Sequence, residues 1–165
     1  MTFAPRTWVV GEVVSAATMN QEIRDQFNSF FGAWTVYTPT WTGTSTNPSI
    51  GNGTITGRYM KIGRTVICEM NLVTGSTTTY GAGQYGFSLP AQAAASGVDA
   101  EGTARLTAGA TYIGQAFIIS GGTSMSAAFP TAATPANAGN MTPTAPATLA
   151  AGHTMRLSIV YEAAS

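Results

Sequence analysis

Charged side chains are scarce in this sequence. Seven Lys or Arg and seven Asp or Glu residues make up 8% of 165 residues and cancel to a formal net charge of zero, whereas an ordinary soluble domain carries roughly 25% charged residues. A neutral surface with few charges attracts polyanions weakly, so we expect neither nucleic acid nor an anionic lipid surface as a partner. Thr, Ser, Asn and Gln must supply the polar surface, which suits a protein packed in an assembly.

Cysteine and histidine are almost absent as well. Cys68 is the single cysteine and His153 the single histidine, which excludes an intrachain disulfide and leaves too few ligands for a structural zinc site. We therefore expect no metal and no cofactor, and a fold held by burial within the chain or between subunits. Cys68 falls on the apolar face of an expected strand and is interpreted as a small buried hydrophobe.

Long hydrophobic runs are also missing. The longest runs, such as residues 117–119, fall far short of the roughly 20 residues that span a bilayer, so no membrane insertion is expected. Pro5 and Glu12 interrupt the N-terminal stretch where a secretion signal needs a basic start and an unbroken apolar core. We expect these first residues to belong to the mature protein.

The sequence does contain one helical pattern, near its start. Ser15 is expected to cap a helix that runs to about Phe31. Apolar residues recur there at spacings of three and four, which places them on one stripe: Ala16, Met19, Ile23, Phe27 and Phe30. So short an amphipathic helix must pack its stripe, either on the body of the protein or on copies of itself around a symmetry axis. Upstream, an extended arm is expected with Trp8 as its anchor.

From Trp34 onward the apolar period changes to two. This change predicts a docking arm and helix over residues 1–33 and a head domain over residues 34–165. Expected strands cover residues 54–62, 64–74, 85–89, 111–120 and 155–161, and Pro39 confines the extended segment 34–41 to a sheet edge. Several short strands with Gly, Thr and Pro turns favour a mainly β fold, an antiparallel β-sandwich or jelly-roll head with an extended arm and one short amphipathic helix.

Residues 121–152 are uncharged and rich in Ala, Thr and Pro. In isolation this composition is that of a linker. A long loop without secondary structure is uncommon inside a compact domain unless it has a function, and one such function is to wrap a neighbouring subunit. For residues 131–147 both interpretations, disorder and wrapping, stay open.

The glycine-rich stretch 47–75 does not match a phosphate-binding loop. Gly51, Gly53 and Gly57 give the spacing G-x-G-x-x-x-G and precede two strands, and no Gly-Lys-Ser/Thr follows, so the glycines are interpreted as turns and strand kinks. The cations of this stretch are expected to be solvated charges that guard a sheet edge: Arg58, Lys61 and Arg64.

No set of residues assembles an active site, and we expect no enzyme. His153 lacks a nucleophile elbow or paired carboxylates, and Asp99 and Glu101 lie in a stretch interpreted as a solvated loop. Four aromatic residues suggest a glycan-stacking or partner-contact surface, although aromatic residues near strand ends more often pack in the core: Trp34, Tyr37, Trp41 and Tyr59.

Four stretches together resemble virion structural proteins of tailed actinobacterial phages and their prophages. They are APRTWVVGEVVSAATMNQEIRDQFN, WTVYTPTWTGTSTNPSIGNGTITGRYMKIGRTV, GSTTTYGAGQYGFSLP and RLSIVYEA. The resemblance covers about two thirds of the chain, without residues 91–152. It implies a virion role on the capsid or on the tail, and defines no catalytic residues.

The chain has no collagen-like, heptad or β-helical shaft, which favours a capsid decoration or head-spike protein over a tail fibre. We expect a homotrimer, made in the host cytoplasm, that docks on the major capsid protein and stabilises the shell. The expected docking residues are Phe3, Trp8, Val9, Met19, Ile23, Phe27 and Phe30. The alternative is a tail-tip or tail-fibre protein that contacts other tail proteins and recognises a host surface glycan.

Overall fold

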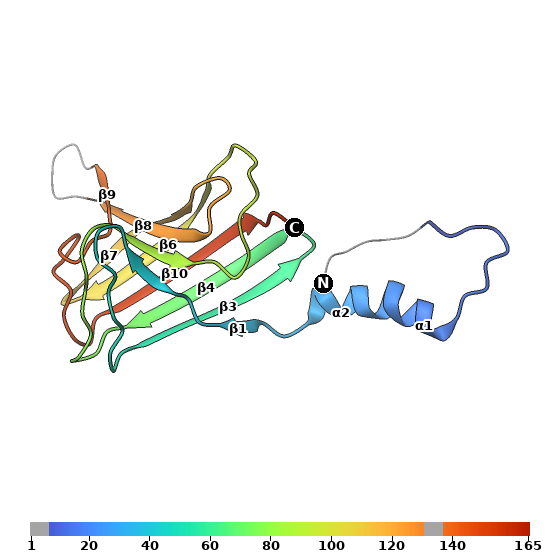
Figure 1. Cartoon of the computed structure of the whole chain (residues 1–165), viewed down its shortest axis with the longest axis horizontal. Coiled ribbons are helices and arrows are strands. Elements are labelled where there is room, and N and C mark those ends of the chain that lie inside the picture. Colours follow the sequence, from blue (N-terminus) through green and yellow to red (C-terminus); the bar gives the residue numbers. More distant parts are fainter. Residues whose placement is uncertain (1–6, 131–136) are drawn as a thin grey trace.

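The computed structural model describes residues 7–130 and 137–165, and it consists of a β head from which a helical arm projects (Figure 1). The arm contains α1 (Ala16–Met19), the π-helical segment η1 (Asn20–Arg24) and α2 (Asp25–Phe31). The strands are β1 (Thr35–Tyr37), β2 (Trp41–Gly43), β3 (Thr54–Ile62), β4 (Thr65–Val73), β5 (Tyr85–Ser88), β6 (Ala100–Ala108), β7 (Ala110–Ile118), β8 (Ser124–Pro130), β9 (Ala138–Asn140) and β10 (Thr154–Glu162).

All strands pair antiparallel, in the order β1-β3-β4-β10-β6-β7-β8-β5-β2, with β9 beside β8. The sheet curls strongly, because β8 pairs with β5 through residues 124–125 and with β7 through residues 126–128. β1 and β2 form the two edges, and only residues 38–40 separate them. The mainly β, sandwich-like fold is thus confirmed, as one curled sheet around a single core.

The segments with the strongest alternating patterns form central strands of the sheet. Val66, Cys68, Met70 and Leu72 of β4 are at most 3% exposed, and β10 buries every second residue from Met155 to Tyr161. Gly63 makes the tight turn between β3 and β4 with a φ of 59°, a conformation that favours glycine. The expectation that Cys68 is a buried hydrophobe is also confirmed, since it is 0% exposed.

Strands β6 and β8 lie where the sequence did not predict strands. Residues 100–108 form β6, so the interpretation of Glu101 as part of a solvated loop is wrong. Residues 124–130, placed within the linker-like segment, form β8 and bury Met125, Ala127 and Phe129 at no more than 1% exposure. β6 turns mostly alanine toward the core, and alanine gives a weak strand signal. In β8 the alternating apolar pattern is short and lies within Ala/Thr/Pro-rich sequence.

Most of the remaining Ala/Thr/Pro-rich segment packs on its own head. Met141 is 1% exposed and Leu149 is 5% exposed, both within the core. The Met141 amide donates to the Ala127 carbonyl at 2.8 Å, and the Tyr85 amide donates to the Met141 carbonyl at 3.0 Å. Residues 137–147 are therefore ordered against their own head, and residues 131–136 of the expected loop lie outside the described residues.

The predicted helix is present from Ala16 to Phe31, with a π-helical middle that the pattern did not predict. Ser15 caps it as expected, because its Oγ accepts from the Thr18 amide at 3.1 Å. In the middle, the Asp25 amide bonds to the Asn20 carbonyl, five residues back. The expected boundary falls between the end of α2 and the start of β1 at Thr35.

Candidate functional site

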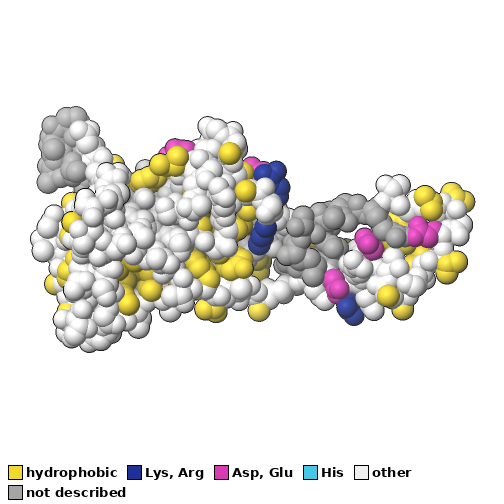
Figure 2. Space-filling view, viewed as in Figure 1, with side chains coloured by type: hydrophobic (Ala, Val, Ile, Leu, Met, Phe, Trp, Pro, Cys, Tyr) yellow, Lys and Arg dark blue, Asp and Glu magenta, His cyan; other side chains and the backbone are white. Residues whose placement is uncertain are grey.

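Exposed apolar residues are concentrated in the N-terminal arm. Nine of the fourteen exposed large hydrophobics among the described residues lie between positions 8 and 30, and Figure 2 shows hydrophobic side chains spread along this projecting part. They are Trp8, Val9, Val10, Val13, Val14, Met19, Ile23, Phe27 and Phe30. A concentration of this kind marks an interaction surface, because single soluble chains rarely leave large apolar patches in water.

The helical part of this surface is the predicted stripe. Met19, Ile23 and Phe30 are 40–43% exposed and Phe27 is 61% exposed, and the helix points away from the head (Figure 1). The head of the same chain leaves these stripe residues exposed. We call residues 8–30 the apolar arm; the predicted docking residues Trp8 and Val9 belong to it, and Phe3 lies outside the described residues.

Tyr37 fastens the arm to the head. Its ring lies against Gly57, where an added Cβ would stand 2.3 Å from the ring. Its hydroxyl is 3.1 Å from Cys68 Sγ, and its ring meets Tyr59 edge-on at 5.9 Å between centroids. Burial, with the Cys68 hydrogen bond, raises the pKa of Tyr37 well above its ordinary value. Tyr37 and Tyr59 thus make the contacts that hold the short edge strand β1.

The four expected glycan-contact aromatics do not form one surface. Trp34 lies under the guanidinium of Arg58, 4.9 Å from the ring centroid. Trp41 is 8% exposed and packs against Tyr85 and Phe87 in the core. Trp41 is therefore not available for stacking on a sugar, whereas Trp34, Tyr37 and Tyr59 are each partly exposed.

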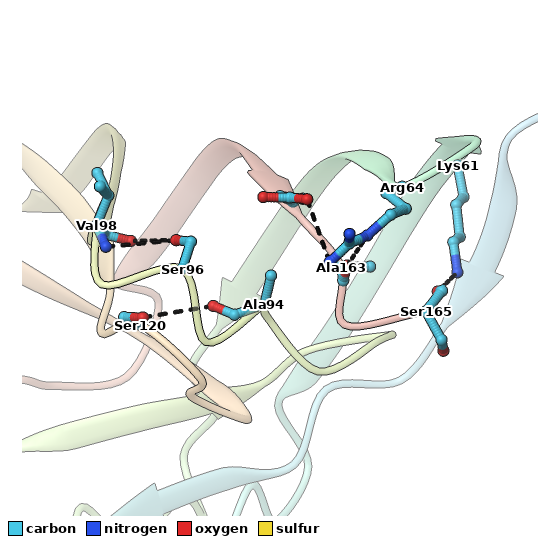
Figure 3. Close-up of polar contacts among 9 residues, drawn as sticks. Lys61, Arg64, Ala94, Ser96, Val98, Ser120, Ala163 and Ser165 are labelled. Atoms are coloured by element: carbon cyan, nitrogen blue, oxygen red, sulfur yellow. Dashed lines mark hydrogen bonds and ion pairs between the residues drawn. The ribbon is translucent and has the colours of Figure 1, made fainter.

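The three cations of the glycine-rich stretch all have partners. Arg58 holds Glu69 through Nη2 at 2.6 Å. Arg64 pairs with Glu162 at 3.2 Å and donates to the Ala163 carbonyl at 3.0 Å, and Lys61 donates to the Ser165 carbonyl (Figure 3). Their interpretation as solvated edge charges is incomplete, since Lys61 and Arg64 tie the β3–β4 hairpin to the C-terminal residues.

The singled-out acidic and histidine residues have structural partners too. Asp99 Oδ1 accepts from the Ser120 amide at 2.8 Å. In the same loop region the Ser120 hydroxyl donates to the Ala94 carbonyl, and the Ser96 hydroxyl donates to the Val98 carbonyl (Figure 3). His153 Nδ1 accepts from the Ala150 amide at 3.1 Å. These contacts shape turns and bring no catalytic pair together.

A groove of about 770 Å³ lies on the sheet face that points away from the core. Three arginines and one glutamate line it, together with exposed Val36 and Ile113: Arg58, Arg105, Arg156 and Glu69. Sequence reasoning missed Arg105 and Arg156, which are 51 positions apart yet directly opposite in the β6–β10 ladder. Their outward positions in alternating strands indicated that both side chains lie on the surface. The strand register that pairs them cannot be read from the sequence.

Buried hydroxyl and thiol groups predict a loss of stability in alkali. Burial raises the pKa of Tyr85, Tyr161 and Cys68 above their ordinary values. The unfolded chain then loses protons that the folded chain keeps, so stability is complete below about pH 8.5–10 and falls as pH rises further. Each group adds a slope of about 1.4 kcal/mol per pH unit. Urea denaturation at a series of pH values from about 7 to about 11.5 measures the decline in the free energy of unfolding.

Tyr85→Phe is the control for that series. It removes one titrating group along with the hydrogen bond to the Tyr80 carbonyl at 2.6 Å, which lowers stability at neutral pH by about 1 kcal/mol. The decline in alkali should become shallower. An unchanged slope would mean that Tyr85 does not titrate as part of unfolding.

Comparison with protein-family models, curated proteins and solved structures finds no match to this chain. Within the described residues, no three His, Cys, Asp or Glu side chains lie close enough to hold a metal ion. No helix in residues 7–130 and 137–165 has the length and apolar character needed to cross a membrane.

Proposed function

We propose that the chain is a non-enzymatic structural protein of a phage particle, a capsid decoration or head-spike protein that docks through its N-terminal arm. The observation that carries this proposal is the apolar arm, which holds nine exposed large hydrophobics outside a head with a complete core of its own. The assignment to a phage particle rests on the resemblance of the arm and the β3–β4 region to phage virion proteins.

The arm and the head have separate roles, association for the arm and a core of its own for the head. The head buries a core to which no described residue of the arm contributes. The arm exposes Phe27 and its stripe partners, which gain roughly 1.5–3 kcal/mol each when they are fully buried. Copies of the helix around a threefold axis would bury these stripes on one another, while the extended residues before Ser15 reach the shell. Each bound trimer then stabilises the shell by mass action.

A tail-tip protein that recognises a host glycan is the second candidate. The observation that favours it is the open groove with Arg58, Arg105 and Arg156 on the outer sheet face. Such a groove is available to a ligand when the arm is anchored elsewhere.

Quantitative mass spectrometry of purified particles separates the two candidates. A decoration protein is expected at a copy number close to that of the capsid subunits, and particles assembled without it should lose heat and osmotic resistance. A tail-tip protein is expected in a few copies per particle, with unchanged capsid resistance after its removal. Absence of the chain from purified particles would contradict both.

A further inference from the structure

We propose that the outer sheet face between β6 and β10 binds an acidic saccharide, with its carboxylate or phosphate held between Arg105 and Arg156. This inference depends on the head alone and does not require the assembly role of the arm.

Strand register places the two guanidinium groups side by side. Arg105 lies directly opposite Arg156, and Thr107 lies directly opposite Thr154, two residues along each strand on the same face. These four residues line a small cup of about 90 Å³. The cup therefore combines two forked cationic donors with two hydroxyl donors, which is the chemistry that recognises a carboxylate or phosphate oxygen.

No acidic side chain of the described residues neutralises this cup. Glu69, the only acidic residue of the adjoining groove, is held by Arg58 at 2.6 Å. Arg156 Nε donates to Asn71 Oδ1 at 3.2 Å, which orients it without removing its charge. Arg105 forms no ion pair or hydrogen bond with any described residue. Like charges directly opposite in a sheet are unfavourable, and an oxyanion between them reverses that repulsion.

The groove beside the cup indicates what carries the oxyanion. Both hollows share Arg105 and Arg156, so a ligand anchored in the cup extends into the larger groove. The groove presents neutral polar side chains and exposed aliphatic ones: Thr56, Asn71, Thr103, Ser158, Val36 and Ile113. Amides and hydroxyls match sugar hydroxyls, whereas aliphatic groups match the apolar faces of a sugar ring. A groove of about 770 Å³ also has room for more than the oxyanion itself.

Titration of the full chain with tetragalacturonate, followed by calorimetry and amide NMR shifts, tests the site. We expect saturable binding with shifts in β6 and β10, weakened by salt, and no binding of the fully methyl-esterified tetrasaccharide, which keeps the sugar but lacks the charge. Glucose 6-phosphate, run in parallel, reports whether a phosphate serves as well as a carboxylate. Arg105→Gln and Arg156→Gln should each weaken binding about tenfold or more, the loss of one charged hydrogen-bond donor.

Arg64→Gln is the matched control, because it makes the same change in net charge at the far end of β4 and should leave the affinity unchanged. Melting temperatures of all three variants confirm that the head stays folded. The proposal is overturned if neither sugar acid binds, or if Arg64→Gln weakens binding as much as Arg105→Gln. It is also overturned if inorganic phosphate binds as tightly as glucose 6-phosphate, or if a pentaglutamate peptide binds more tightly than both sugars.

Discussion

If the chain forms the proposed homotrimer through its stripe, replacing Ile23 and Phe27 with aspartate is expected to convert that trimer into monomers and leave the head intact. Both side chains are exposed in the single chain, at 40% and 61%, so their removal costs the monomer little. In an oligomer their exposed parts would be buried, which contributes roughly 1.5–3 kcal/mol per protomer for the two side chains together, so their loss should weaken association by about tenfold to a hundredfold. Sedimentation velocity at micromolar concentration measures the change.

Gln21→Asp provides the matched control for the stripe. Gln21 is exposed on the same helix and is offset from the stripe by half a turn, so the oligomer should survive this substitution. Thermal unfolding of the head should be the same in both variants. A wild-type chain that is monomeric at these concentrations, or a double variant that stays oligomeric, would contradict self-association through the stripe.

Phe129→Ala is expected to destabilise the head by about 3–5 kcal/mol, the usual cost of truncating a fully buried aromatic side chain. Phe129 is 1% exposed near the end of β8, and its ring also lies within 3 Å of a Cβ added at Gly114. Denaturant unfolding of wild type and variant measures the difference in free energy of unfolding. A loss of this size is roughly a third to a half of the stability of a domain of about 10 kcal/mol.

Ile119→Ala is the comparison for Phe129→Ala. Ile119 follows β7 and is 64% exposed, so its truncation should change the free energy of unfolding by no more than about 0.5 kcal/mol. If Phe129→Ala were equally mild, the segment 124–130 would have to be a linker, as its composition alone suggests.

The sequence was informative where large side chains alternate. Val66, Cys68, Met70 and Leu72 predicted β4 and its buried face, and Ser15 predicted the helix start, because these signals are local. β6 was missed because alanine fills most of its inward positions, and β8 was missed because its short alternation, with Ala127 between Met125 and Phe129, lies within linker-like sequence. Ala104 and Ala127 are 2% and 1% exposed, yet alanine is common in every kind of structure and carries no period of its own.

Long-range features could not be predicted for a different reason. The cup depends on the pairing of Arg105 with Arg156, and many registers of β6 and β10 are compatible with the same sequence pattern. Trp41 was grouped with three other aromatic residues as a possible glycan or partner contact, although a position near a strand end more often means core, and the structure places it in the core beside Tyr85. The stripe was recognised from its period, and only the structure shows that the head leaves it open.

The three-residue strand β1 also determines how the molecule would carry mechanical load. Any tension between an anchored arm and the head passes through Thr35–Tyr37, which pairs only with β3. The arm continues roughly along the strand direction (Figure 1), so pulling shears this short ladder and loads its hydrogen bonds together. The Tyr37 ring packs against Gly57 and so resists sliding of β1 along β3. This contact, rather than the core, should set the force at which the head and the arm separate.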